Sequence, residues 1–356
     1  MTSRRGFLAG LAAAGLVPRT TWASAGAPAL LAAARTDTGA YVLCGLSGAG
    51  EVLFDIPLPD RGHAAAAHPH RAEAVAFARR PGRFAIILNC VSGAVLATLD
   101  APAGRHFYGH GSFSLDGRYL FTTENDYEAG LGVIGIWDSA QDYRRVGEYY
   151  SGGVGPHEIK TLPSGDLVVA NGGIETHPDA GRAKLNIPTM EPNLCYLSTD
   201  GEVLETVKLD HSLHKNSIRH LDVSRDGLVA AGMQWQGDAG QVVPLVFTHK
   251  QGEAAVILDV GTALYRRMDG YVGSIAIDSA GQTVAATSPR GGLVLTAELG
   301  GPAPKTAIDT HADVCGVAYG PWGRMVTTGR GQVIGGLSLS PNDYPKLHWD
   351  NHLVRI

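Results

Sequence analysis

Histidine is the residue whose type and placement in this sequence most clearly suggest chemistry. Among 14 histidines in 356 residues, His110, His157 and His220 each stand seven or eight residues before a glycine, in GHGSFSLDG, GPHEIKTLPSG and RHLDVSRDG. Imidazole binds Zn, Cu, Fe and Ni, and side chains from separate elements can converge on one ion. The spacing therefore predicts that these three histidines bind a transition metal ion: iron, copper or zinc.

Other polar side chains extend this predicted site. We expect four to lie on the same face as further metal ligands or as their hydrogen-bond partners, namely Glu124, Asp126, Glu175 and His177. Three more histidines stand at roughly comparable positions before other glycines, namely His68, His70 and His311. A structural role remains the alternative, because such histidines can hydrogen-bond neighbouring repeats, as the recurring histidine of WD repeats does.

The segment 171–193 is a long polar insertion, and it predicts an ordered loop that reaches across the mouth of the site. Arginine binds carboxylates and phosphates bidentately, so Arg182, Arg219 and Arg290 could clamp an anionic ligand. They could equally pair with Glu124 and Asp126 and only rigidify the rim. The other predicted ligand-binding residues are Asn125, Asn171, Glu175 and Cys315.

The sequence has four cysteines. Cys44, Cys90 and Cys195 fall at equivalent third-strand positions of different repeats, which should hold their Cα atoms beyond the ~7 Å limit for a disulfide. We expect these three to be small buried core residues. Cys315 begins an inner strand and is the one thiol for which we predict a role in the site.

Short apolar runs, broken about every ten residues by Gly, Asp, Ser or Pro, indicate an all-β fold. The segment 106–137 shows the unit, in which Asp116-Gly117 between two apolar runs predicts a hairpin with a type I′ turn. Similar glycine turns recur at intervals that bracket the length of a propeller blade. They lie at Gly82, Gly165, Gly227, Gly281 and Gly323.

These six turns predict six blades, and residues 30–58 supply three more strands without an inner one. The C-terminal stretch 347–356 could return to complete that first blade. We therefore predict a seven-bladed β-propeller, a single domain over residues 26–356 whose ring is closed by the C-terminal strand. Six or eight blades remain open. Long, varied loops between second and third strands should gather on one face, where function is usually carried.

The first 25 residues predict a targeting segment. Ser3-Arg4-Arg5-Gly6-Phe7-Leu8 matches the twin-arginine export pattern, an apolar run follows over 9–17, and Ala23-Ser24-Ala25 fits a cleavage site. A retained membrane anchor is the alternative, but the apolar run is well below the roughly 18 residues that span a bilayer. We predict cleavage after residue 25 and a periplasmic protein without a stable membrane anchor.

Composition and motifs narrow the function classes. The net charge of −5 and the lack of a basic stripe argue against nucleic acid as a partner. The sequence contains no G-x-S-x-G, H-E-x-x-H or C-x-x-C-H motif, which are typical of serine hydrolases, zinc proteases and haem attachment. We expect a monomer.

Distinctive segments spread over the chain point to one family. They are Tyr108-Gly-His-Gly111, Thr123-Glu-Asn-Asp126, Gly155-Pro-His157, Ala170-Asn-Gly-Gly-Ile-Glu-Thr-His-Pro178, Ser217-Ile-Arg-His220, Ser288-Pro-Arg-Gly291 and Trp349-Asp-Asn-His352. The sequence resembles a family of unknown function: twin-arginine-exported, propeller-like bacterial proteins often encoded beside imelysin-type iron-uptake proteins. The resemblance implies export and a propeller, and it links the chain to iron by gene neighbourhood. A more distant likeness is to lactonase and quinoprotein-like propellers.

Three functions follow from these observations. The first is a periplasmic propeller that binds a metal ion, a metal-bearing ligand or a partner at a His-lined funnel and supports iron or other metal acquisition with periplasmic metal-uptake proteins. The second is a lactonase-type hydrolase, in which Glu124, Asn171 and Asp126 hold a divalent ion that activates water. The third is an interaction platform without catalysis. A His-dominated site favours the first, and an oxygen-dominated site favours the second.

Overall fold

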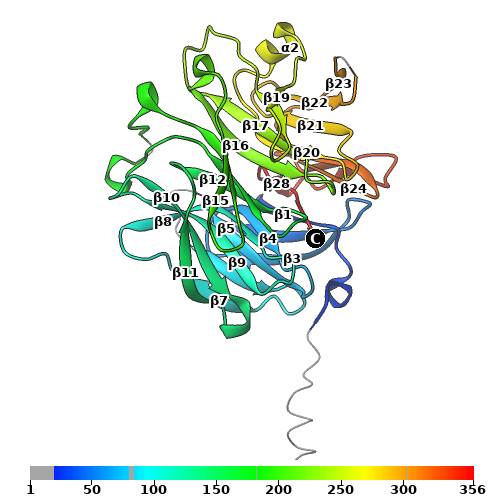
Figure 1. The fold of residues 1–356 in the computed structure, drawn as a ribbon. Coiled ribbons are helices and arrows are strands. Elements are labelled where there is room, and N and C mark those ends of the chain that lie inside the picture. Colours follow the sequence, from blue (N-terminus) through cyan, green and yellow to red (C-terminus); the bar gives the residue numbers. More distant parts are fainter. Residues whose placement is uncertain (1–19, 80–83, 182, 302) are drawn as a thin grey trace, which may run out of the picture.

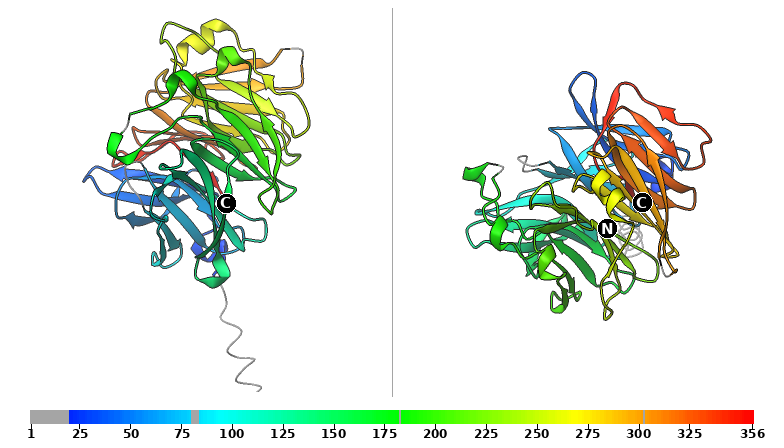
Figure 2. Two further views of the ribbon diagram at one scale, coloured as in Figure 1. Left: turned by 60° about the vertical axis from the view of Figure 1, so that its left-hand side comes forward. Right: turned by 90° about the horizontal axis from the view of Figure 1, so that it is seen from above.

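A computed structural model of the protein describes residues 20–79, 84–181, 183–301 and 303–356. Its strands form seven antiparallel sheets that stand as blades around a central channel (Figures 1 and 2). The prediction of a single-domain, all-β, seven-bladed propeller is confirmed. No helix in the described part of the chain is long and apolar enough to cross a membrane.

Each blade lines the channel with one strand and adds further strands outwards. From the channel outwards, the first blade contains β28 (Leu347–Trp349) with β29 (Val354–Arg355), β1 (Leu30–Thr36), β2 (Tyr41–Leu46) and β3 (Val52–Leu58), and the second contains β4 (Gly62–Ala67), β5 (Glu73–Ala78), β6 (Ala85–Asn89) and β7 (Val95–Leu99). The third blade contains β8 (Arg105–Phe113), β9 (Tyr119–Asp126), β10 (Leu131–Asp138) and β11 (Arg144–Tyr150), the fourth β12 (Pro156–Thr161), β13 (Leu167–Asn171), β14 (Asn193–Leu197) and β15 (Val203–Val207), and the fifth β16 (Asn216–Val223), β17 (Val229–Trp235), β18 (Val246–His249) and β19 (Val256–Ile257). The sixth blade contains β20 (Ser274–Ile277), β21 (Thr283–Ser288), β22 (Leu293–Glu298) and β23 (Lys305–Thr310), and the seventh β24 (Val314–Gly320), β25 (Gly323–Thr328), β26 (Gln332–Gly335) and β27 (Asn342–Asp343). Short helices in the connections are η1 (Trp22–Ala25), η2 (Ser139–Gln141), η3 (Pro178–Ala180), η4 (Ile187–Thr189), η5 (His211–Leu213) and α2 (Thr262–Arg267).

The C-terminal segment closes the ring, as predicted. β28 pairs antiparallel with β1 through Trp349 and Ala34, and β29 pairs with the same strand through Val354 and Leu31. The end of the chain therefore lies in the middle of the molecule, beside β1 and β4 (Figure 1). The first blade is built from both ends of the described chain, which removes the open edge that the first three strands would leave.

Glycine turns connect inner strands to second strands in most blades. Gly117, Gly165 and Gly227 all have positive φ, and each donates its N–H to the carbonyl three residues earlier, as Gly117 does to Ser114 at 2.8 Å. The prediction of a type I′ turn at residues 116–117 was wrong, because that turn needs two residues with positive φ. Only the glycine adopts it, whereas Asp116 does not.

The blade that holds Gly82 differs from the prediction by one strand. Gly82 lies outside the described residues, but β5 ends at Ala78 and β6 begins at Ala85, so it falls between the second and third strands. The turn after the inner strand is instead built around His68, whose Nδ1 accepts the N–H groups of His70 and Arg71 at 3.1 Å. His68 and His70 therefore lie at the turn end of the channel, away from the varied loops.

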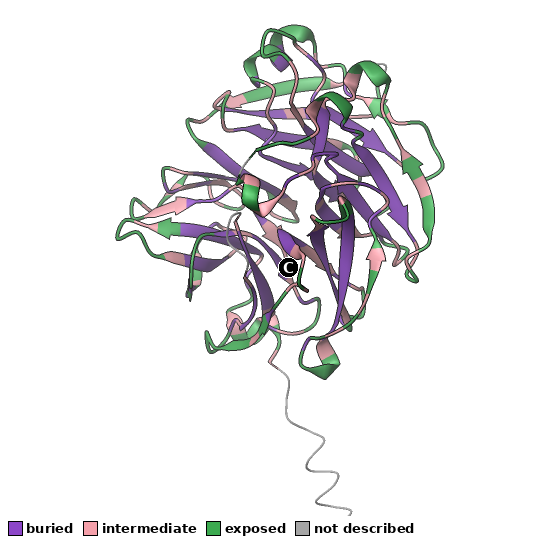
Figure 3. Cartoon of the chain, turned by 90° about the vertical axis from the view of Figure 1, so that its left-hand side faces the viewer, coloured by how far each residue is buried: buried purple, intermediate pink, exposed green. Residues whose placement is uncertain are grey.

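Burial depends on the distance of a strand from the channel (Figure 3). All five residues of β13 are buried, whereas β11, at the edge of its blade, alternates between exposed and half-buried residues. Neighbouring blades pack face to face, as where Phe77 of β5 meets Phe107 of β8 with ring centroids 6.4 Å apart. The core is thus divided among the interfaces between blades, which hold the inner strands in fixed positions around the channel.

The long loop after β13 is held in place by side-chain amides. Asn186 accepts the N–H of Glu175 at 2.8 Å and donates to the carbonyl of Gly173 at 2.9 Å. Asn125 of β9 donates to the carbonyl of Thr176 at 2.9 Å, which ties the loop to the preceding blade. These contacts fix the described residues of the loop, 172–181 and 183–192, to its own blade and to the preceding one.

The predicted targeting segment, residues 1–25, lies mostly outside the described residues. Its described end packs against the second blade, where Trp22 of η1 donates its indole N–H to the carbonyl of His68 at 2.8 Å. The N–H of Ala72 also donates to the carbonyl of Thr20 at 2.9 Å. Cleavage after residue 25 stays a prediction.

Candidate metal centre

Five histidines from five blades meet in the channel. They are His63 on β4, His110 on β8, His157 on β12, His220 on β16 and His352 between β28 and β29. In this order they form a closed ring in which neighbouring imidazole centroids are 4.9, 4.9, 4.9, 5.1 and 4.7 Å apart. We call this ring the histidine layer. The structure thus brings together all three histidines that the sequence analysis selected as ligands, and it adds two more.

Bulges in the inner strands place the histidines of this layer. The pairing register of β4 with β5 shifts between Gly62 and Ala65, and that of β8 with β9 shifts between Phe107 and Gly111, so that His63 and His110 lie inside bulges. Similar shifts occur on β12 around His157 and on β16 just before His220. A bulge redirects a side chain out of the regular alternation of a strand. In these four blades the sequence therefore presents one imidazole to the channel at a comparable level.

Two groups of three histidines have a geometry that could hold a metal ion. One contains His63, His110 and His157, and the other contains His110, His220 and His352; in each group the candidate ligand nitrogens lie within 4.8 Å of one another. His110 belongs to both, and its Nε2 is 3.2 Å from Nε2 of His63. Three imidazoles that leave further coordination positions open are a common arrangement around zinc and other transition metals.

The imidazoles of the histidine layer are in a protonation state that suits metal binding. Nδ1 of His157 and Nε2 of His352 are buried and find no hydrogen-bond partner among the described residues. Burial, followed by the neighbouring imidazoles and Arg219, lowers the pKa of His110, His157 and His352 well below its ordinary value. Neutral imidazole is the form that binds metal, so these side chains need not lose a proton at neutral pH.

Two carboxylates lie close to the histidine layer. Glu158 lies 3.8 Å from Nδ1 of His110 and 3.5 Å from Nδ1 of His220, and Asp350 lies 3.7 Å from Nδ1 of His63. Burial alone would raise the pKa of both carboxyl groups. For Glu158 burial is the largest single cause, but the charge of Lys160, 2.9 Å away, together with His220 and His352 outweighs it and lowers the pKa well below its usual range. Ionised carboxylates behind imidazoles fix ring orientation and increase ligand basicity.

His63, Arg79 and Arg61 have the same effect on Asp350. They outweigh its burial and lower the pKa of this carboxyl group. Arg79 Nη1 lies 2.9 Å and Arg61 Nη2 lies 2.7 Å from the carboxylate. Asp350 is therefore a fixed negative charge next to His63.

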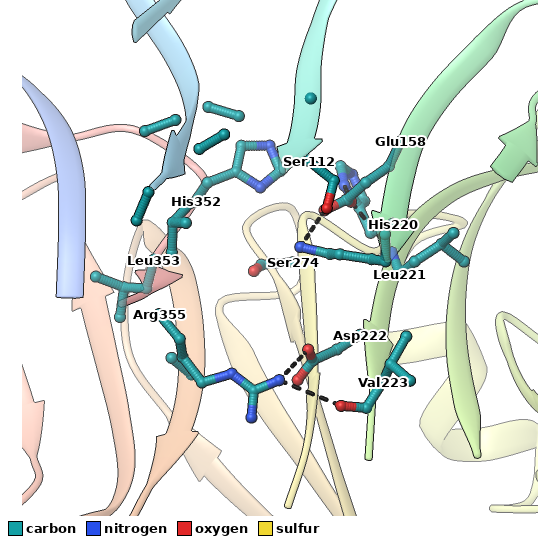
Figure 4. Close-up of a pocket in the computed structure, with 18 of the residues that line it drawn as sticks. Ser112, Glu158, His220, Leu221, Asp222, Val223, Ser274, His352, Leu353 and Arg355 are labelled. Carbon is teal, nitrogen blue, oxygen red and sulfur yellow. Dashed lines mark hydrogen bonds and ion pairs between the residues drawn. The ribbon is translucent and has the colours of Figure 1, made fainter. Parts of the chain in front are cut away.

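The histidine layer separates two cavities of about 270 Å³ each. The loop-face cavity is lined by His63, His157 and His220 together with side chains of the varied loops, such as Lys184 and Arg290. The opposite cavity is lined by inner strands only. Figure 4 shows it, with His352 on one wall and Glu158 and His220 on the other. An ion in the layer would therefore be reachable from the loop face.

The predicted acidic ligands do not reach the histidines. Glu124 lies on β9, its side chain is fully buried, and Oε1 accepts from Arg145 at 2.6 Å and from Thr122 at 2.9 Å. Asp126 pairs with Arg105 at 3.3 Å. The physical reason is that β9 extends through residue 126, so that these residues belong to a strand rather than to a loop at the channel mouth.

The predicted amide and loop residues serve other contacts. Asn171 bonds Ser151 at 2.7 Å and Asn193 at 2.9 Å, and Asn125 holds the loop as described above. His177 caps η3 by accepting the N–H of Asp179 at 3.2 Å and lies 3.7 Å from Glu128. Glu175 is half-buried in the same loop, and none of these residues belongs to the groups that could hold a metal.

The predicted cationic and thiol residues divide into three cases. Arg219 and Arg290 line the loop-face cavity, as expected for residues that contact an anion. Arg182 lies outside the described residues. Cys315 lies on the inner strand β24 as predicted, but its Sγ donates to the carbonyl of Trp349 at 3.3 Å, and burial raises its pKa to about 12. A thiol with this pKa is poorly reactive at neutral pH.

The other three cysteines are buried and free, as predicted. Burial raises the pKa of Cys44 and Cys90 to about 12 and that of Cys195 to about 11. His311 is half-buried outside the histidine layer, where its N–H donates to the carbonyl of Gly292 at 2.9 Å.

Sequence reasoning missed four residues of the centre: His63, Glu158, Asp350 and His352. His63 was missed because the glycine turn of its blade was assigned one strand too late. Glu158 directly follows a predicted ligand, and Asp350 and His352 lie in the distinctive Trp349-Asp-Asn-His352 segment. The signal was the position of that segment in the closing strand, which enters the channel.

Comparisons with known proteins place the chain in a family and a fold. A search of curated proteins finds no match. Among solved structures, Kuenenia stuttgartiensis hydrazine synthase is 14% identical, with a TM-score of 0.59 and 89% of each chain covered. Kluyvelomyces marxianus Hsv2 is 10% identical, with a TM-score of 0.46 and coverage of 76% of this chain and 74% of that chain. The first likeness concerns the propeller fold alone.

A family model matches residues 56–356, which include all five histidines of the layer. The matched range is most of the chain and six complete blades with the closing strand. The chain therefore belongs to the family described as "Protein of unknown function (DUF1513)".

Proposed function

We propose that this protein is a periplasmic propeller that binds a transition metal ion in its histidine layer and supports the acquisition of iron or another metal. The observation that carries the proposal is the closed ring of five imidazoles in the channel, with buried nitrogens of His157 and His352 that have no hydrogen-bond partner among the described residues. A buried polar atom without a partner costs free energy. One metal ion would satisfy several such atoms at once.

The donor set supports a transition metal. Nitrogen donors favour zinc, copper and iron over magnesium and calcium, which prefer oxygen. The channel could hold the ion through His110 and the two other histidines of either group, with Glu158 or Asp350 close behind the rings. Such an ion would act as a Lewis acid and keep positions open for a further ligand.

A lactonase-type hydrolase is less well supported. That chemistry requires an ion held by oxygen donors next to a water molecule. The residues predicted for it, Glu124, Asn171 and Asp126, instead bond Arg145, Asn193 and Arg105 in separate places. An interaction platform without metal is the remaining alternative, and the metal measurement below decides it.

The proposal also includes a compartment and partners. The twin-arginine pattern of residues 3–8 supports export to the periplasm of a protein folded before transport. The resemblance to proteins encoded beside imelysin-type genes supports periplasmic metal-uptake proteins as partners. We expect the propeller to act as a monomer in this setting.

Metal content tests the proposal directly. The protein is purified without chelator from its native host, and iron, copper and zinc are quantified by elemental mass spectrometry. We expect about one ion per chain and its loss in His110→Ala, because His110 belongs to both groups of ligands. The matched control is His177→Ala, because this histidine lies in the loop outside the layer.

The two variants separate ligand loss from unfolding. Circular dichroism and the urea midpoint of His110→Ala must show a folded protein for the metal result to count. Wild-type protein that stays free of metal after reconstitution with each of the three ions would contradict the proposal. Equal metal loss in both variants would also contradict it, because only one of them removes a channel ligand.

A further inference from the structure

The loop-face cavity has an unusual charge. Four cationic side chains line it: Arg79, Lys184, Arg219 and Arg290. Among the described residues that line this cavity, none carries a carboxylate. Neutral polar groups complete the wall, among them Tyr108, Gln234 and Asn351. The wall above the histidine layer therefore has a strong positive potential directed at the same space.

Arg79 has its counter-charge outside the cavity, and Lys184 and Arg290 contact neutral groups. Arg79 pairs with Asp350 at 2.9 Å, behind the wall. Arg290 stacks on the ring of Tyr271 at 4.6 Å, and Lys184 donates to the neutral amide of Gln236 at 2.5 Å. Neither contact supplies a negative charge.

The cations of the wall are close enough to repel each other. Burial lowers the pKa of Lys184, and the charges of Arg219 and Arg290 lower it further. After burial, the charge of Arg219 is the largest cause that lowers the pKa of His157. An anion placed between these side chains would remove repulsion at three points and would touch the edge of the histidine layer.

We infer that the loop-face cavity binds a small polycarboxylate, which presents the metal to the histidine layer as an anionic chelate. This inference rests on the proposed metal site. One carboxylate would face His157 and the ion, and the others would be bound by Arg219, Arg290 and Lys184. Guanidinium groups bind carboxylates bidentately. The cavity of about 270 Å³ is close to the lower limit of about 300 Å³ for small-ligand pockets, which suits a compact ligand.

Calorimetry with citrate, a tricarboxylate, tests this assignment on metal-free protein. The Arg219→Gln/Arg290→Gln variant and the single variant Lys184→Gln are compared with wild type. The matched control is Arg225→Gln, because Arg225 is exposed beside the Gly227 turn on the other face. We expect saturable binding that weakens with salt, falls at least about tenfold in the double variant and changes less than about twofold in the control.

A zinc titration of the same proteins keeps the two proposals apart. Zinc affinity in the arginine variants should stay within about threefold of wild type, because the imidazole ligands are intact. Absent citrate binding, or equal binding in the double variant, would overturn the inference even if zinc binds. Inorganic phosphate that binds as tightly as citrate would overturn the choice of a polycarboxylate. Citrate binding without zinc, iron or copper binding would support the anion site and contradict the metal site.

Discussion

The two cavities on either side of the histidine layer differ in how their charges are paired. In the opposite cavity every strong charge has a partner: Lys160 lies 2.9 Å from Glu158, and Arg355 donates to Asp222 at 2.5 Å. In the loop-face cavity, Lys184 and Arg290 contact neutral groups instead. Removing one partner of a buried pair destabilises a fold, whereas cations that contact only neutral groups can accept an anionic ligand. The comparison indicates a structural side and a binding side of the same channel.

The largest expected effect is the pH dependence of stability that the histidine layer causes. His110, His157, His220 and His352 have pKa values below the ordinary value of 6.5, with burial as the main cause. The unfolded chain therefore binds more protons below pH 6.5, and the stability of metal-free protein should fall with acid. The slope is about 1.4 kcal/mol per pH unit for each histidine that stays neutral. Below about pH 4.5, the unfolded chain also protonates Glu158 and Asp350 while the folded protein keeps them ionised, which adds to the loss.

Urea unfolding at pH 7.5 and 5.5 measures this slope. His110→Leu should reduce it by about one proton, since one neutral histidine is removed. A wild-type midpoint that does not move between these two pH values would contradict neutral imidazoles. Saturating zinc should raise the midpoint at pH 7.5, because it binds only the folded protein.

A smaller effect is expected from the charged pair of the opposite cavity. Lys160→Met should lower the free energy of unfolding by about 2 kcal/mol, because it leaves the buried Glu158 carboxylate without its main counter-charge. This figure is below that for a fully buried pair, since the lysine side chain is 31% exposed. Urea denaturation at pH 7.5 measures it. Adding Glu158→Gln should restore part of the loss, and strictly additive losses would show that the pair does not act as one unit.

The smallest expected effect is the difference in stability between one arginine variant in the opposite cavity and one in the loop-face cavity. Arg355→Gln should cost about 1 kcal/mol of unfolding free energy, since the Arg355 side chain is 34% exposed in its pair with Asp222. Arg290→Gln on the loop face should change stability by less than about 0.5 kcal/mol, because lost stacking on Tyr271 is offset by reduced repulsion with Lys184. The two midpoints are measured side by side in urea. A larger loss for Arg290→Gln than for Arg355→Gln would reverse the assignment of structural and binding sides.

The fold was predictable because the turns that separate its strands have local signals in the sequence. Glycine turns such as Gly117 and Gly227 follow inner strands at blade-length intervals, and positive φ at these positions requires little beyond the adjacent residues. The closing strand was also predictable, since residues 30–58 lack an inner partner. The type I′ assignment failed because one left-handed glycine after an ordinary turn carries the same Asp-Gly signature.

The candidate site was predictable only in part. His110, His157 and His220 share a local spacing before a glycine turn. His63 lies in a blade whose turn after the inner strand is not at Gly82, and His352 reaches the channel only when the C-terminal segment closes the ring. Glu124 illustrates the other limit. The direction of the Glu124 side chain depends on how far β9 extends and on the position of Arg145 two strands away. Such facts are set by register across a blade, which sequence spacing does not specify.

Ring closure has a consequence for the order of folding. Residues 347–356 carry the latch that pairs with β1 and also His352 and Asp350 of the centre. Because β1 lies far away in the sequence, this pairing depends on the intervening blades bringing the two segments together. An intermediate in which the latch is not yet paired has neither a closed ring nor a complete set of imidazoles, so a ligand of the centre would favour the closed ring over the open one.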